Sequence, residues 1–306
     1  MNKLKQLLFL RSIKGLANAK INDLYLPILD EASDLDDLIA IIEYKFKLSL
    51  ENLENAKIKA EKLYDEIIND SEINVITIFD EDYPKKLNAM GNKKPLILFI
   101  KGNADILKEP NIAIIGTRKP SKLSEYFEES LVKNVVKSTN RIIVSGLAFG
   151  CDKIAHKTTV DENKITIAVL PSGVNVIKPS SHKKLAEDII KTGGCLVSEY
   201  NPDSKVTRGS YVERDQIVAA FSDATFVIEC GIESGTMHTV DFAKKYNRQI
   251  YCYLPDERSE GFYDGNEFIL KNISSSIKVD NIDEFLEELE TLKVKKKPKT
   301  VQQTLM

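Results

Sequence analysis

The spacing of apolar residues along the chain changes once, near residue 72. Before that point they recur at steps of three and four residues, as on a helix with one buried face. Ser33 with Asp36 resembles a capping box before one helix, and Ser49 can cap the next. We therefore expect residues 1–72 to form a small all-α domain. The clearest apolar stripe in it consists of Leu53, Ala56, Ala60, Leu63 and Ile67.

After residue 73 come two short apolar runs bridged by residues 82–84, and from residue 111 onward such runs alternate with helical patterns. These runs are apolar at every position rather than at alternate ones, so helices should cover both faces of the sheet. Strands that alternate with helices form a parallel sheet with right-handed crossovers. The expected strands lie at 75–79, 96–100, 111–116, 141–146, 164–170, 195–200, 225–229, 249–254 and 276–280. The expected helices lie at 122–138, 149–159, 183–191, 213–221, 236–245, 264–270 and 282–289.

The predicted fold class is α/β: an extended Rossmann-like parallel sheet flanked by helices, preceded by the small N-terminal all-α domain. We assign residues 73–290 to the Rossmann-like domain. Residues 291–306 contain the run KVKKKPKT, which is rich in lysine and poor in apolar residues. Because such a segment cannot bury enough apolar surface to fold, we expect a disordered tail there.

Composition narrows the possible partners. The net charge of −3 excludes a protein coated in positive charge, so a polyanion would have to bind in a local pocket. No apolar run is long enough to cross a membrane, and the N-terminus lacks a signal-peptide cleavage pattern, so we expect no membrane association. The four cysteines form no C-x-x-C and the three histidines are scattered, which predicts no metal site and a reducing, cytoplasmic location.

The loops that follow the predicted strands are rich in glycine and hydroxyl groups. In an open parallel sheet, ligands bind beside the carboxyl ends of the strands. Gly116, and Gly146 after Ser145, let backbone amides approach an anion closely. Thr117 can donate a hydrogen bond, and Arg118 can hold a phosphate through two parallel hydrogen bonds. These loops predict a phosphate-binding site.

Two later loops add to this predicted site. Lys178 and Lys183 follow a glycine turn and could neutralise phosphates. Ser234, Gly235 and Thr236 open a helix whose N-terminus attracts anions. We include all five residues among the candidates for phosphate binding.

Glu233 and Tyr211 are the candidates for contact with a base or a sugar. A carboxylate repels phosphate, so we expect Glu233 to accept a hydrogen bond from a base or a sugar hydroxyl. Tyr211 offers a ring on which a base can stack, and Arg214 opens the helix beside it. The alternative for Tyr211 is a loop tyrosine that covers the edge of the core.

The sequence argues against catalysis. Asp152 and His156 lie one helical turn apart and could form an acid–base pair, but we favour an aspartate that stabilises a helix N-terminus and a histidine that packs locally. No G-x-G-x-x-G follows a strand and no G-x-x-x-x-G-K-[ST] is present, which argues against a dinucleotide enzyme and a Walker-type ATPase. We expect no catalytic residues and no cofactor.

Five ordered motifs together resemble the DprA/Smf family of proteins that bind single-stranded DNA and help to load RecA. The resemblance runs from about residue 82 to residue 254. The motifs are G-T-R-K-P-S at 116–121, S-G-L-A-x-G-x-D-x-x-A-H at 145–156, V-L-P-S-G-V-N at 169–175, S-E-Y at 198–200 and E-S-G-T at 233–236.

This resemblance implies a non-enzymatic homodimer that binds single-stranded DNA and passes it to a RecA-like recombinase during natural transformation. It implies that Arg118 and its loop contact the DNA backbone, with Lys178, the lysines after it and Arg214 around the same pocket. The N-terminal helices resemble the family's small helical domain, of SAM or helix-hairpin-helix type. Three positions depart from the family pattern: Asp215 and Gln216 stand where the family has an asparagine and an arginine, and Cys151 stands where it has an isoleucine.

The alternative is a nucleotide-binding or nucleotide-hydrolysing Rossmann protein. Phosphoribohydrolase-like enzymes and nucleotide sensors of anti-phage systems use a glycine-rich turn with a carboxylate close by, which residues 233–236 resemble loosely. In that case Glu233, or Asp152 with His156, would be the acid–base groups.

Overall fold

The computed structural model describes residues 2–257 and 261–292. Nearly all of the predicted disordered tail, 291–306, therefore lies outside the described residues. The helices are α1 (Lys3–Ser12), α2 (Asn18–Lys20), α3 (Leu35–Phe46), α4 (Leu50–Ile68), α5 (Lys122–Ser138), α6 (Cys151–Asp161), α7 (Lys183–Lys191), α8 (Ser210–Phe221), α9 (Thr236–Lys245), α10 (Asp264–Asn272) and α11 (Ile282–Thr291). The strands are β1 (Ile73–Thr77), β2 (Ile97–Gly102), β3 (Asn111–Ile115), β4 (Ile142–Ser145), β5 (Thr166–Val169), β6 (Cys195–Ser198), β7 (Ala224–Val227), β8 (Gln249–Tyr253) and β9 (Ser276–Val279).

One sheet runs through the described residues, with the strand order β1-β2-β6-β5-β4-β3-β7-β8-β9. From β6 to β9 every neighbouring pair is parallel, which confirms the α/β fold with its Rossmann-like sheet. The two strands before residue 111, whose direction the sequence did not indicate, differ from the rest: β1 and β2 form an antiparallel pair and β2 joins β6 antiparallel. No crossover helix connects β1 to β2, so the chain turns back and β2 pairs with β1 in the antiparallel direction.

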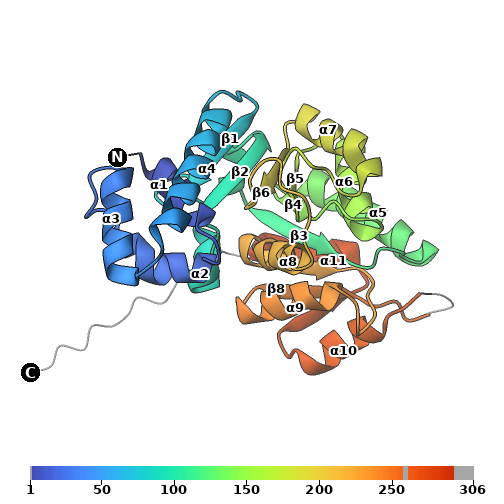
Figure 1. Cartoon of the computed structure of the whole chain (residues 1–306). Helices are drawn as coiled ribbons and strands as arrows, with labels where there is room; N and C mark the ends of the chain where they lie inside the picture. The colour runs from blue at the N-terminus through green and yellow to red at the C-terminus, as the bar shows by residue number, and fades with distance from the viewer. Residues whose placement is uncertain (1, 258–260, 293–306) are drawn as a thin grey trace, which may run out of the picture.

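Helices cover both faces of the sheet (Figure 1). Ile112 and Ile114 of β3 share a buried core with α5 and α6, whereas the intervening Ala113 and Ile115 share one with α8 and α9. This period of two is the ordinary alternation of a strand, and here both of its faces are apolar. The expected cover on both sides is therefore confirmed.

The N-terminal helices extend the same face as α5, α6 and α7. Leu7 and Phe9 of α1 and Leu53 of α4 lie in one apolar cluster with Ile97 and Phe99 of β2. The predicted stripe along α4 is buried, with Leu63 only partly so. The division into parts at residues 72/73 and 290/291 stays a prediction.

The first residue of a helix follows its capping residue. In three cases the cap or the start lies one to three residues from the predicted position. Ser49 caps α4 as expected, but α3 is capped by Asp34, whose side chain accepts from the Asp37 amide at 2.8 Å, and not by Ser33. The helix predicted from residue 149 begins at Cys151, because Gly150 has a φ of 71°. The helix predicted from residue 213 begins three residues earlier, at Ser210.

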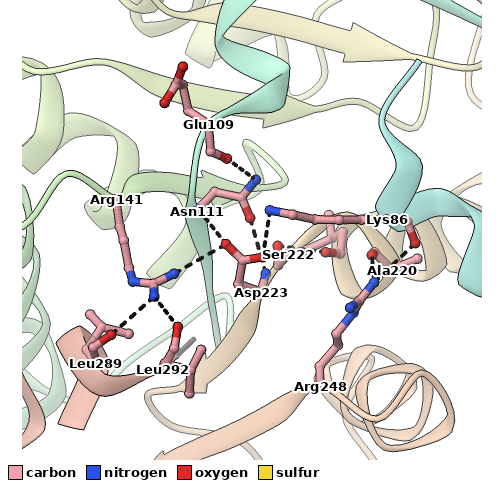
Figure 2. Close-up of polar contacts among 11 residues, drawn as sticks. Lys86, Glu109, Asn111, Arg141, Ala220, Ser222, Asp223, Arg248, Leu289 and Leu292 are labelled. Carbon is pink, nitrogen blue, oxygen red and sulfur yellow. Dashed lines mark hydrogen bonds and ion pairs between the residues drawn. The ribbon is translucent and has the colours of Figure 1, made fainter. Parts of the chain in front are cut away.

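An ion cluster ties together the amino ends of four parallel strands, as Figure 2 shows. Asp223, just before β7, lies 2.7 Å from Lys86 and 3.2 Å from Arg141, which precedes β4. The same carboxylate accepts from the backbone amide of Asn111, at the start of β3. Arg248, before β8, donates to two backbone carbonyls. Because ligands bind at the opposite, carboxyl ends, we assign this cluster to stability.

Candidate functional site

A cavity of about 400 Å³ opens at the carboxyl edge of the sheet, between the loops after β3, β4 and β7 and the facing helices α8 and α9. It brings together most of the residues singled out in the sequence, although they come from four separate segments. Those that line it are Gly116, Thr117, Arg118, Gly146, Tyr211, Arg214, Ser234, Gly235 and Thr236.

A buried carboxylate, Glu229, holds the loop after β3 in place. One of its oxygens accepts from the backbone amide of Ser121 at 2.9 Å and from the hydroxyl of Ser121 at 2.7 Å. The other accepts from the amide of Phe262 at 3.0 Å, and the Glu229 carbonyl accepts from the amide of Thr117 at 2.7 Å. The segment between Thr117 and Ser121, which carries Arg118, is thus fixed at both ends.

Arg118 and Tyr211 form the mouth of the cavity. The Arg118 guanidinium is exposed and lies 5.4 Å from the centroid of the Tyr211 ring, a cation–π distance. This contact orients a free cation beside a half-buried aromatic ring. The pair can therefore meet a phosphate and a base at once.

Two glycines allow the loops to approach each other. A Cβ on Gly146 would lie 1.2 Å from Nη1 of Arg214, so the turn after β4 passes directly over that guanidinium. Gly150 has a positive φ, and a Cβ there would lie 2.3 Å from the carbonyl oxygen of Thr117. At both positions a side chain would push the walls of the cavity apart.

Arg214 lies on the inner wall, between two carboxylates. Its Nη1 is 3.6 Å from Oδ2 of Asp152, and its Nε is 2.9 Å from Oδ1 of Asp215. The side chain of Arg214 is only 6% exposed. Burial raises the pKa of Asp215 to about 6, although the Arg214 charge acts in the opposite direction. The inner wall thus carries one cation and up to two anions, unlike the mouth.

Four predicted site residues do not line the cavity. Lys178 and Lys183 are exposed, in the loop after β5 and at the start of α7. Glu233 is exposed beside the turn before α9. Ser145 is buried, and its hydroxyl donates to the carbonyl of Ile114 at 2.7 Å. The roles of these side chains in ligand binding stay predictions.

The side chains of Asp152 and His156 have separate hydrogen-bond partners and do not bond to each other. The Asp152 carboxylate accepts from the amide of Ala148, as an aspartate at a helix N-terminus does. His156 is fully buried and lies 2.9 Å from the hydroxyl of Thr166, and burial lowers its pKa to about 4. No group of three or more potential metal ligands is present in the described residues.

Sequence reasoning missed several residues of the site, among them His238, Thr239 and Glu229. His238 and Thr239 line the cavity from α9, three and four residues after Gly235, so the helical period alone could have placed them there. Glu229 is recognisable in the sequence as the polar residue that ends the apolar run 225–229, but nothing in the sequence indicates which loop it holds.

Together, the fold and the cavity define a Rossmann-like protein with an anion-compatible pocket at the carboxyl edge of its sheet. The model of the family "DNA recombination-mediator protein A" matches residues 74–290. The chain belongs to this family of DNA-processing recombination mediators, which confirms the resemblance to the DprA/Smf proteins.

Individual relatives agree with this assignment. The DNA processing protein DprA of Streptococcus pneumoniae is 31% identical over 195 residues, which cover 64% of this chain and 67% of the relative. The protein Smf of Escherichia coli is 31% identical over 210 residues, 69% of this chain and 55% of that protein.

Two solved structures share the fold. DprA of S. pneumoniae has a TM-score of 0.78 at 25% identity, covering 94% of this chain and 98% of that one. DNA processing protein A of Helicobacter pylori, whose structure concerns its single-stranded DNA binding mode, has a TM-score of 0.64 at 28% identity, covering 72% and 96%. In the described part of this chain, no helix has the length and apolar character needed to span a membrane.

Proposed function

We propose that the protein binds single-stranded DNA at this cavity and presents it to a RecA-like recombinase. The observation that carries the proposal is the mouth of the cavity, where the exposed Arg118 lies over the ring of Tyr211. A nucleotide whose phosphate binds this guanidinium has its base beside the aromatic ring. The H. pylori relative, described by its single-stranded DNA binding mode, supports the same ligand class.

The phosphate contacts in this proposal lie on the outside of the cavity. Arg118 and Thr117 meet one phosphate, and the amides of Gly235 and Thr236 at the start of α9 meet the same or the next one. Lys178 and Lys183 are exposed outside the cavity, where they can contact further phosphates of the bound DNA strand. Arg214, buried between two carboxylates, shapes the inner wall instead of holding a phosphate.

We further propose that the protein acts without chemical turnover, as a homodimer. The Asp152 and His156 side chains, the best acid–base pair in the sequence, are each engaged elsewhere, which supports a binding role. The four cysteines are buried free thiols, which suits the reducing cytoplasm. The biological setting within this proposal is the uptake and recombination of DNA.

Fluorescence anisotropy of a labelled oligo-dT across a salt series tests DNA binding. We expect the affinity to fall with salt, with a slope of about −0.7 per phosphate contacted. Arg118→Ala should weaken binding by about tenfold and reduce that slope by about the value of one phosphate.

Lys271→Ala, an exposed cation on α10 away from the cavity, is the matched control and should leave the affinity unchanged. If well-folded protein shows no binding at low salt, the proposal is wrong. Equal losses in the two variants would instead place the DNA elsewhere on the surface.

A further inference from the structure

The charges of the cavity are arranged in two zones. At the mouth stands the exposed cation Arg118, with the uncharged turn of residues 234–236 nearby. On the inner wall, Arg214 is matched by Asp152 and Asp215, so these three side chains together carry an excess of one negative charge when both carboxylates are ionised. A nucleotide that enters this field places its phosphate outside and a hydrogen-bond donor inside.

Asp215 is the more exposed of the two inner carboxylates, with 17% of its side chain exposed against 11% for Asp152. Asp152 uses Oδ2 for both the amide of Ala148 and Nη1 of Arg214. Asp215 meets Nε of Arg214 through Oδ1, and within the described residues no hydrogen bond reaches its Oδ2. Its side chain is 17% exposed and lines the cavity, so a ligand can reach it.

We propose that Asp215 selects the base that enters the cavity, by accepting a hydrogen bond from an exocyclic amino group. The inference rests on the proposed function, since it takes single-stranded DNA as the ligand. Carboxylates pair with the amino group of cytosine, whereas uracil and thymine carry a carbonyl oxygen at the same position, which a carboxylate repels. The cavity therefore prefers cytosine to uracil at equal size and equal charge.

A purely structural role for Asp215 makes a different prediction. If the carboxylate only neutralised Arg214, its removal would change the binding of all oligonucleotides by the same factor. Selection by Asp215 changes the ratio between two bases. The ratio of dissociation constants for oligo-dC and oligo-dU separates the two roles, because both strands carry the same phosphates and neither carries a ring methyl group.

The test is competition of unlabelled oligo-dC and oligo-dU, of equal length, against a labelled strand bound to the wild-type protein. We expect oligo-dC to bind tighter by about fivefold to tenfold, the effect of one charge-assisted hydrogen bond. Asp215→Asn, which presents a donor as well as an acceptor, should bring the ratio close to one. Asp241→Asn, an exposed carboxylate on α9 that does not line the cavity, should keep the wild-type ratio.

The wild-type measurement stands even if Asp215→Asn folds poorly. Equal affinity of the wild-type protein for both strands overturns the selection by Asp215 and leaves DNA binding intact. A preference for oligo-dC that persists unchanged in a folded Asp215→Asn variant overturns it as well. If neither strand binds at low salt, the proposed function fails, and this inference fails with it.

Discussion

Burial raises the pKa of three carboxyl groups. Asp215 lines the cavity, Glu199 follows β6, and Glu128 faces the thiol of Cys151 beneath the loop after β3. In each case loss of solvent is the largest influence and raises the pKa, despite an opposing hydrogen bond or cation. These three carboxyl groups therefore hold protons at pH values where exposed ones have lost them.

Glu199 makes the stability of the protein depend on pH. Its carboxylate accepts from the side chain of Asn18, and burial raises its pKa to about 7. Because the folded state holds this proton more tightly than the unfolded state, the stabilisation is complete below the unfolded pKa and is lost as the pH rises through about 7. Urea unfolding should show a loss of up to about 3 kcal/mol from Glu199 between about pH 5 and about pH 8.

Glu199→Gln should remove most of that loss, since a glutamine does not titrate. Glu187→Gln, an exposed position on α7, is the control and should keep the wild-type profile. Parallel stability profiles for Glu199→Gln and the wild type would contradict the assignment of the pH dependence to Glu199.

At the scale of elements, the turn between β4 and α6 fixes the depth of the cavity. Gly146→Ala places a methyl group where Nη1 of Arg214 lies, so the arginine must leave its position between Asp152 and Asp215. We expect a loss of stability of about 2 kcal/mol, from overpacking and a broken buried ion pair, together with weaker DNA binding. Chemical denaturation and anisotropy measure the two effects.

Gly235→Ala is the matched stability control in another loop of the same cavity. No atom lies within 4 Å of the added Cβ, and the backbone φ of −58° suits alanine. Its free energy of unfolding should stay near that of the wild type. Equal stability of the two alanine variants would show that Arg214 has room to move.

At the scale of the whole molecule, the ion cluster at the amino ends of the strands should be separable from DNA binding. Asp223→Ala leaves Lys86 and Arg141 without their shared carboxylate in a largely buried place. We expect a loss of about 3 kcal/mol in the free energy of unfolding. Below the unfolding transition, the affinity for oligo-dT should match the wild type, and a large loss of affinity in the folded variant would contradict this separation.

Much of this architecture could be predicted, because its periodic signals are local. The bounds of α5, α7 and α9 match the expected ranges, since each helix has a clear apolar period or a clear cap. The antiparallel edge could not be seen, because an apolar run carries no mark of its direction. The loops of the candidate site were found through their glycines, as strand ends meet at one edge of a parallel sheet.

What sequence reasoning missed depends on distant contacts. The phosphate contact of Arg214 stays a prediction, and its guanidinium lies under Gly146, between two carboxylates. Asp215 is the next residue of α8, whereas Asp152 belongs to α6, and no spacing along the chain indicates that Asp152 meets Arg214. Charge at the site is therefore a property of the folded assembly, and residue types alone overestimate how positive it is.

The contact between α1 and the end of β6 has a consequence for synthesis. Arg11 donates to the carbonyl of Glu199, across 188 residues of sequence, and its guanidinium lies over the ring of Phe99. A ribosome adds residues from the N-terminus at a finite rate, so the first helix emerges long before Glu199. Helix α4 and strand β2 are available to its apolar residues earlier, but Arg11 lacks its carbonyl partner until the chain has been translated beyond β6. The earliest segment of the chain is thus among the last to complete its packing.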